Sequence, residues 1–123
     1  MTSVQSNDAR VKDLVAKFTE IGIAQYRAAY VIDTARYNRL YKAMQRVRAE
    51  LNAMPGDQRR ALLPLLAHSN VQVKQMAANT LLGIAPIPAR RALEEVKASG
   101  IQPQCGDAWG MIDALDDGSF IPS

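Results

Sequence analysis

The sequence predicts an all-α protein of about six helices. Apolar residues recur at spacings of three and four along almost the whole chain, and no segment alternates as a strand would. Glycine and proline stand at the breaks between these periodic segments, where they favour turns. The 123 residues, 48% hydrophobic and 22% charged, fit a single globular domain rather than a disordered chain.

Residues 7–54 predict a long N-terminal helical hairpin. Asn7 or Asp8 can cap its first helix, which Gly22 weakens locally, and Asp33 or Thr34 can start its second. In the first helix the apolar face continues through Ile23, Tyr26, Tyr30 and Val31. The second helix has an apolar face made of Tyr37, Leu40, Tyr41, Met44, Val47 and Leu51. An opposite, basic stripe is made of Arg39, Lys42 and Arg46.

Residues 57–85 predict a second, shorter hairpin. Its first helix runs over about 57–67 and is bent by Pro64, and Asn70 caps its second helix. A turn at residues 68–70 joins the two. Small side chains at Ala77 and Ala78 indicate that another helix crosses closely there.

Residues 88–117 predict a third hairpin, followed by a short apolar tail at 118–123. Pro88 fits the first turn of its first helix and Gly100 the end. Asp107 is the expected cap of the last helix, which Gly118 ends.

The segment LLAHSNVQVKQMAANTL, residues 65–81, resembles a HEAT repeat: a Leu pair, a capped turn, Val-Lys, an Ala pair and a Leu. His68 and Lys74 depart from that pattern, which usually has Asp and Arg there. The whole chain also resembles an uncharacterised bacterial family, the domain of unknown function DUF2019, in residues 35–40, 62–85, 89–94 and 103–122. These resemblances imply a HEAT-like α-α superhelix and no known reaction.

Charge is polarised along the chain. The net charge is +3, yet residues 1–54 carry nine Lys/Arg against five Asp/Glu, and residues 101–123 carry four Asp and no Lys/Arg. Such a distribution steers a charged partner, or it brings the acidic end onto the basic body.

The sequence holds no pattern typical of an enzyme, a metal site or a cofactor site, so none is expected. The single His68 and single Cys105 lack a third orienting group for nucleophilic catalysis. His68 is expected to cap the carbonyl groups that end the preceding helix, and Cys105 to be a small core or loop residue or an exposed thiol. A lone cysteine and a polar N-terminus without an apolar signal segment favour the cytoplasm, and no apolar run is long enough for a membrane.

The acidic last helix is the first candidate interaction surface. Asp113, Asp116 and Asp117 lie near its C-terminus, where they oppose the helix dipole. Arg90 or Arg91 of the preceding helix is the expected internal counter-charge, and a basic partner is the external one. Trp109 is either a binding anchor or a half-buried core residue.

Non-enzymatic protein–protein interaction is therefore the expected function, in the form of a bacterial accessory or immunity-type protein. The alternative is a nucleic-acid-binding accessory protein that uses Arg39, Lys42 and Arg46 to contact phosphates. Neither the partner nor the oligomeric state follows from the sequence.

Overall fold

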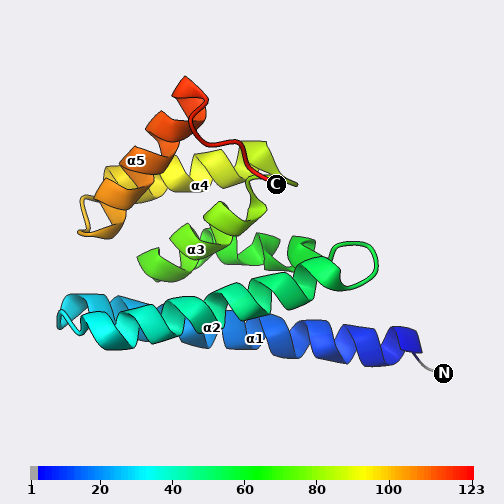
Figure 1. The fold of residues 1–123 in the computed structure, drawn as a ribbon. Coiled ribbons are helices and arrows are strands. Elements are labelled where there is room, and N and C mark those ends of the chain that lie inside the picture. Colours follow the sequence, from blue (N-terminus) through cyan, green and yellow to red (C-terminus); the bar gives the residue numbers. More distant parts are fainter. Residues whose placement is uncertain (1–2) are drawn as a thin grey trace. The chain divides into compact units, whose positions relative to one another are not determined.

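The regular secondary structure of the described residues is entirely helical. The computed structural model describes residues 3–123, and in these it contains six helices and no strand, which confirms the all-α prediction. In chain order they are α1 (Ser3–Tyr30), α2 (Thr34–Ala53), the 3₁₀ helix η1 (Gln58–Ala67), α3 (Val71–Leu81), α4 (Pro86–Ser99) and α5 (Gln104–Asp117) (Figure 1). They form two compact units, which meet in sequence between Leu62 and Leu63, inside η1.

The N-terminal unit is built on the antiparallel hairpin of α1 and α2 (Figure 1). The first helix begins at Ser3, so the expected start at residue 7 or 8 is wrong, and it runs through the buried Gly22 without a break. Asp33 caps α2 as predicted, because its Oδ1 accepts a hydrogen bond from the Arg36 N–H at 3.1 Å.

The buried face of α2 is narrower than the predicted apolar face. Met44, Val47 and Leu51 of α2 are buried, as the periodicity predicts. Tyr41 is instead exposed, although it belongs to the same predicted face. The apolar residues that recur along α2 therefore cover a wider face of the helix than the face that is buried.

The segment around Pro64 is a 3₁₀ helix rather than the expected bent α-helix. Pro64 lies inside η1 and has no N–H to donate to the carbonyl four residues earlier. The tighter 3₁₀ geometry suits a short connecting helix of this kind.

The C-terminal unit, Leu63–Ser123, consists of the end of η1 and the helices α3, α4 and α5, with α4 packed against both α3 and α5. Asn70 caps α3 as predicted, since its Oδ1 accepts hydrogen bonds from the Gln72 and Val73 N–H groups at 2.9 and 3.2 Å. Ala77 and Ala78 are fully buried. A buried hydrogen bond of 2.9 Å from Gln104 Nε2 to Gln72 Oε1 joins α5 to α3.

The helices α4 and α5 start at other residues than predicted, and both end where the prediction places their ends. The helix α4 starts at Pro86, two residues before Pro88, and α5 starts at Gln104, so Asp107 lies in the first turn and does not cap it. Gly100 and Gly118 end the two helices in the left-handed conformation, with φ of 69° and 77°.

The C-terminal tail folds back onto its own unit. The Phe120 N–H donates to the Ala114 carbonyl at 3.2 Å, and the Ser123 backbone reaches Gly83. Ile121 nevertheless remains exposed. Within residues 3–123, no helix is both long and apolar enough to cross a membrane.

Candidate interaction surfaces

The last helix, α5, has one buried and one exposed face. The buried face consists of Gln104, Cys105, Ala108 and Ile112. The four predicted site residues of this helix, Trp109, Asp113, Asp116 and Asp117, are all exposed. Since they are spaced by four, three and one residues, Trp109 and the three carboxylates share the outer side of the helix. This outer side is called the acidic face below.

Trp109 is a surface residue and not part of the core. It is 56% exposed, which disagrees with the core alternative. The Lys97 Nζ of α4 lies 4.5 Å from the centre of the indole ring. A cation–π contact of this kind contributes about 0.5–1 kcal/mol at an exposed site. The indole is thus oriented by a neighbouring helix while much of its surface remains open to solvent.

Asp116 has an internal counter-charge, and of the two expected arginines it is Arg90. The Arg90 Nη1 and Nη2 atoms donate to the two Asp116 oxygens at 2.7 and 3.1 Å. Arg90 also lies 3.5 Å from Glu94 on its own helix. The two-bond pair lowers the pKa of Asp116 and raises that of Arg90. Arg91 is exposed.

The other two carboxylates of the acidic face differ in their surroundings. Asp117 Oδ1 accepts a hydrogen bond from the Ser119 N–H at 2.8 Å, and that bond lowers the pKa of Asp117. Asp113 is exposed, and among the described residues it makes no hydrogen bond or ion pair. Asp113 lies one turn from Trp109, so the exposed indole stands beside an unpaired negative charge.

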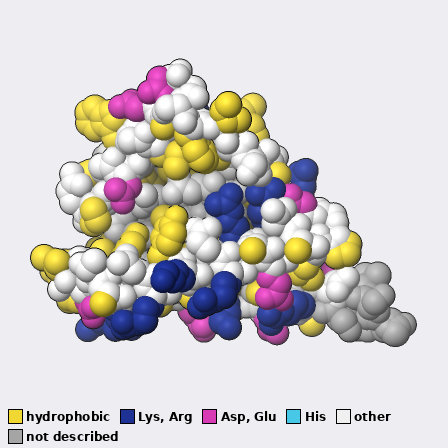
Figure 2. All heavy atoms as spheres, viewed as in Figure 1, with side chains coloured by type: hydrophobic (Ala, Val, Ile, Leu, Met, Phe, Trp, Pro, Cys, Tyr) yellow, Lys and Arg dark blue, Asp and Glu magenta, His cyan; other side chains and the backbone are white. Residues whose placement is uncertain are grey.

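The predicted basic stripe lies on α2. Arg39, Lys42 and Arg46 are exposed, and no ion pair engages them in the described part of the chain. Figure 2 shows Lys and Arg side chains spread along the α1–α2 hairpin, with carboxylates among them. The structure therefore leaves all three cations accessible.

A hollow of about 250 Å³ extends the basic stripe to α1, where Arg10 and Lys17 line it together with Arg46 and Glu50. Arg10 is already engaged there, because its guanidinium donates two hydrogen bonds to Glu50 at 2.5 and 2.8 Å. This pairing lowers the pKa of Glu50. A negative charge thus lies among the cations of this surface.

A third surface was missed by the sequence reasoning: an apolar tip where α1 turns into α2. It consists of Ile23, Tyr26, Tyr30, Val31 and Ile32, and Tyr30 and Ile32 are 78% and 84% exposed. The first four were expected to continue the apolar face of the first helix. A signal was present in the sequence, because residues directly before the Asp33 cap must lie in the turn.

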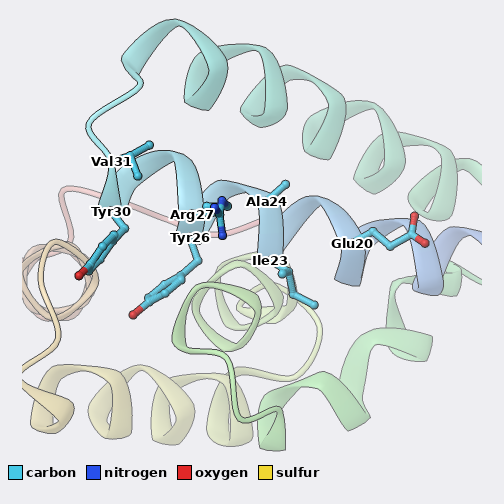
Figure 3. A pocket seen from close by; sticks show the side chains of 7 residues that line it. All are labelled: Glu20, Ile23, Ala24, Tyr26, Arg27, Tyr30 and Val31. Carbon is cyan, nitrogen blue, oxygen red and sulfur yellow. The ribbon is translucent and has the colours of Figure 1, made fainter.

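The apolar tip encloses a hollow of about 480 Å³ on α1. Figure 3 shows the rings of Tyr26 and Tyr30 projecting in the same direction from successive turns, with Ile23 one turn earlier. The lining also includes Glu20 at one end, and Ala24, Arg27 and Val31. The hollow is thus lined mostly by apolar and aromatic side chains, with one carboxylate and one guanidinium among them.

Comparison with known proteins identifies the family of this chain. The family model for the domain of unknown function DUF2019 matches residues 12–116. The chain belongs to this family. The crystal structure of protein RPA1889 from Rhodopseudomonas palustris CGA009 is similar, with 42% sequence identity and a TM-score of 0.89, over 92% of this chain and 93% of that chain. Among curated proteins there is no match.

His68 and Cys105 of this DUF2019 chain form no hydrogen bond with each other. The His68 backbone N–H donates to the Leu65 carbonyl at 3.1 Å, so His68 caps a carbonyl group of η1 through its backbone. Its ring has another role, because Nδ1 accepts a hydrogen bond from the Asn70 N–H at 2.9 Å. The ring instead stabilises the turn before α3. Cys105 is a buried free thiol. Within residues 3–123, no group of three or more His, Cys, Asp or Glu side chains is arranged to hold a metal ion.

Lys74, the second departure from the HEAT pattern, forms an ion pair with Glu95 of α4. The pair joins two consecutive hairpins of the C-terminal unit.

Proposed function

We propose that this DUF2019 protein is a non-enzymatic protein–protein interaction module that binds its partner through the acidic face of α5. The observation that carries the proposal is Trp109, 56% exposed on a face that also bears Asp113, Asp116 and Asp117. Tryptophan is enriched among the residues that dominate binding energy. Lys97 already orients the indole, so less side-chain entropy is lost on binding.

The same face indicates the chemistry of the partner. Three carboxylates near the C-terminus of α5 oppose the helix dipole, and Arg90 offsets one of them. A partner that brings Arg or Lys side chains to Asp113 and Asp117 would offset the unfavourable interaction of these two carboxylates with the helix dipole. An apolar pocket on the partner would receive Trp109. A basic protein surface is therefore the proposed partner.

The HEAT-like superhelix is the architecture that we propose for this module. Two local features support it: the buried Ala77–Ala78 pair on α3, a helix that packs against α4, and the Lys74–Glu95 ion pair between α3 and α4. An accessory or immunity-type role in the bacterial cytoplasm is consistent with a small chain that has one buried free thiol.

A pull-down from a lysate of the native bacterium tests the proposal. The tagged protein should capture one defined protein, and Trp109→Ala and Asp113→Lys should each weaken that complex by about tenfold or more in a calorimetric titration. Tyr41→Ala, another exposed aromatic but on α2, is the matched control and should bind normally. Equal affinity of Trp109→Ala and the original protein would refute the proposal.

Nucleic-acid binding is the second candidate, favoured by the three exposed and unpaired cations Arg39, Lys42 and Arg46. Fluorescence anisotropy with a labelled DNA duplex and an RNA hairpin tests it at low and physiological salt. Salt-sensitive binding that is abolished by reversing the three charges would support this candidate and displace the first.

A further inference from the structure

We infer that the partner of the acidic face is a second copy of this chain. The acidic face of one copy would bind the apolar tip of the next copy, so that the protein associates head to tail. This inference rests on the proposed function, since it names the partner of the same face. The indole of Trp109 in one copy would enter the hollow between Tyr26 and Tyr30 in the next copy. The Asp113 carboxylate of α5 would then meet Arg27, which lines that hollow.

Charge complementarity is the first support. The unit that contains the tip carries eleven Lys/Arg against six Asp/Glu, and Leu63–Ser123 carries four against six. Arg27 lines the hollow, and Arg36 and Arg39 follow within the first two turns of α2. All three side chains are exposed and outside every ion pair among the described residues. Asp113 is the matching unpaired carboxylate on α5.

Matching spacing is the second support. On α5, Trp109 and Asp113 are one helical turn apart, and on α1, Ile23 and Arg27 are one turn apart, with Tyr26 and Tyr30 beside them. An indole seated over Ile23 and the tyrosine rings would therefore place the Asp113 carboxylate near the Arg27 guanidinium. Aromatic rings favour such offset or edge-to-face contacts.

The exposed area sets the strength of this contact. An aromatic side chain covers about 150–250 Å², so the open part of Trp109 is roughly 100 Å². Even with Asp113 and the neighbouring side chains, the contact is smaller than the ~800 Å² per partner of a standard interface. The association is thus weak and concentration-dependent, with dissociation constants of roughly 10 µM to 1 mM.

Sedimentation velocity of the full chain tests the inference. The weight-average mass should rise with concentration between about 10 µM and about 1 mM. It should rise less at about 500 mM salt than at about 50 mM, because salt screens the charge contacts. The two faces are different patches, so the contact is heterologous and larger chains or rings should form.

Two variants, each lacking one face, give the decisive measurement. The first is Trp109→Ala/Asp113→Lys and the second is Tyr30→Ser/Ile32→Gly, and all four positions are exposed, so the core stays intact. Each variant alone should remain monomeric. An equimolar mixture should form a dimer and nothing larger, because the first variant retains the tip and the second retains the acidic face.

Each alternative result overturns the inference. The inference is wrong if the unmodified protein stays monomeric up to about 1 mM. It is also wrong if either variant alone associates as the unmodified protein does, or if the mixture of the two variants stays monomeric. Arg27→Glu, a single exposed change, provides a second tip variant. If the tip variants still capture another protein in a Trp109-dependent way while self-association is absent, the proposed function stands and this inference falls.

Discussion

Ile32, in the turn between α1 and α2, is a β-branched residue in a backbone conformation that favours glycine. Its φ is 59°, and it is 84% exposed. The Ile32 and Asp33 N–H groups donate to the Ala29 and Ala28 carbonyls at 3.1 and 2.8 Å, the Schellman pattern that ends a helix. The left-handed conformation costs an L-residue roughly 1–2 kcal/mol. The chain thus keeps an exposed apolar side chain at a cost in stability.

Ile32→Gly should raise the stability of the protein by about 1 kcal/mol, because the strain relieved exceeds the added entropy of the unfolded glycine. Urea unfolding followed by circular dichroism at low protein concentration measures this change. The adjacent Val31→Gly is the control, since Val31 has no positive φ, and it should destabilise slightly. A lower unfolding midpoint for Ile32→Gly would show that the turn is not strained.

Asp57 and Arg59 form a partly buried ion pair at the start of η1. Arg59 is 4% exposed, and its Nε and Nη2 donate to the Asp57 oxygens at 2.9 and 2.7 Å. The pair lowers the pKa of Asp57. A carboxyl group with a depressed folded-state pKa stabilises the fold above its unfolded pKa, about 3.9, and this contribution is lost as the pH falls through the folded value.

Asp57→Asn should therefore lower stability by about 1–2 kcal/mol at pH 7 and flatten the loss of stability in acid below about pH 4. Asparagine tolerates the positive φ of 52° at this position, so the change removes the charge without adding backbone strain. Unfolding midpoints between about pH 2 and 7 test it. Glu50→Gln, at the exposed Arg10–Glu50 pair, should change stability little.

Among the helices, four predicted caps hold, whereas Asn7 or Asp8 and Asp107 do not cap a helix. Asp33, Asn70, Gly100 and Gly118 act as the sequence indicates, because a cap depends on side chains within three residues of the helix end. The 3₁₀ geometry of η1 and the early starts of α1, α4 and α5 were missed. Several conformations satisfy the local preferences there, and packing selects among them.

The contact between the tail and Gly83 is another element that sequence reasoning did not find. A Cβ at Gly83 would lie 2.3 Å from the Ser123 carbonyl carbon, a clash with backbone. The φ of Gly83 is not in the left-handed region, so its own backbone accepts alanine. The glycine is needed there because the tail lies against it.

Gly83→Ala should destabilise the full chain by about 1–2 kcal/mol, through displacement of the tail. The same change should stabilise a chain that ends at Gly118 by about 0.5 kcal/mol, since alanine restricts the unfolded state more than glycine does. Thermal unfolding of the four proteins measures the change of sign. Equal effects in both backgrounds would show that the tail does not rest on Gly83.

For the whole molecule, the buried Cys105 reports on the opening of the C-terminal unit. The thiol lies on the buried face of α5 and forms no disulfide. Its reaction with a disulfide reagent should be at least about 100-fold slower in the native protein than in urea, because reaction requires the helices to separate. Cys105→Ser/Ser119→Cys, with an exposed thiol, should react rapidly. Comparable rates would place Cys105 at the surface.

The sequence by itself determined the all-α class, most helix ends, the family and the residues of two charged surfaces. These follow from periodicity, from caps and from charges, which depend on neighbours a few residues away. Tertiary structure decided which of these residues are free to bind. Arg90 pairs with Asp116 while Asp113 stays unpaired, and Trp109 lies outside the core. It also decided that Tyr30 and Ile32 are exposed, because an apolar residue is buried only where another element covers it.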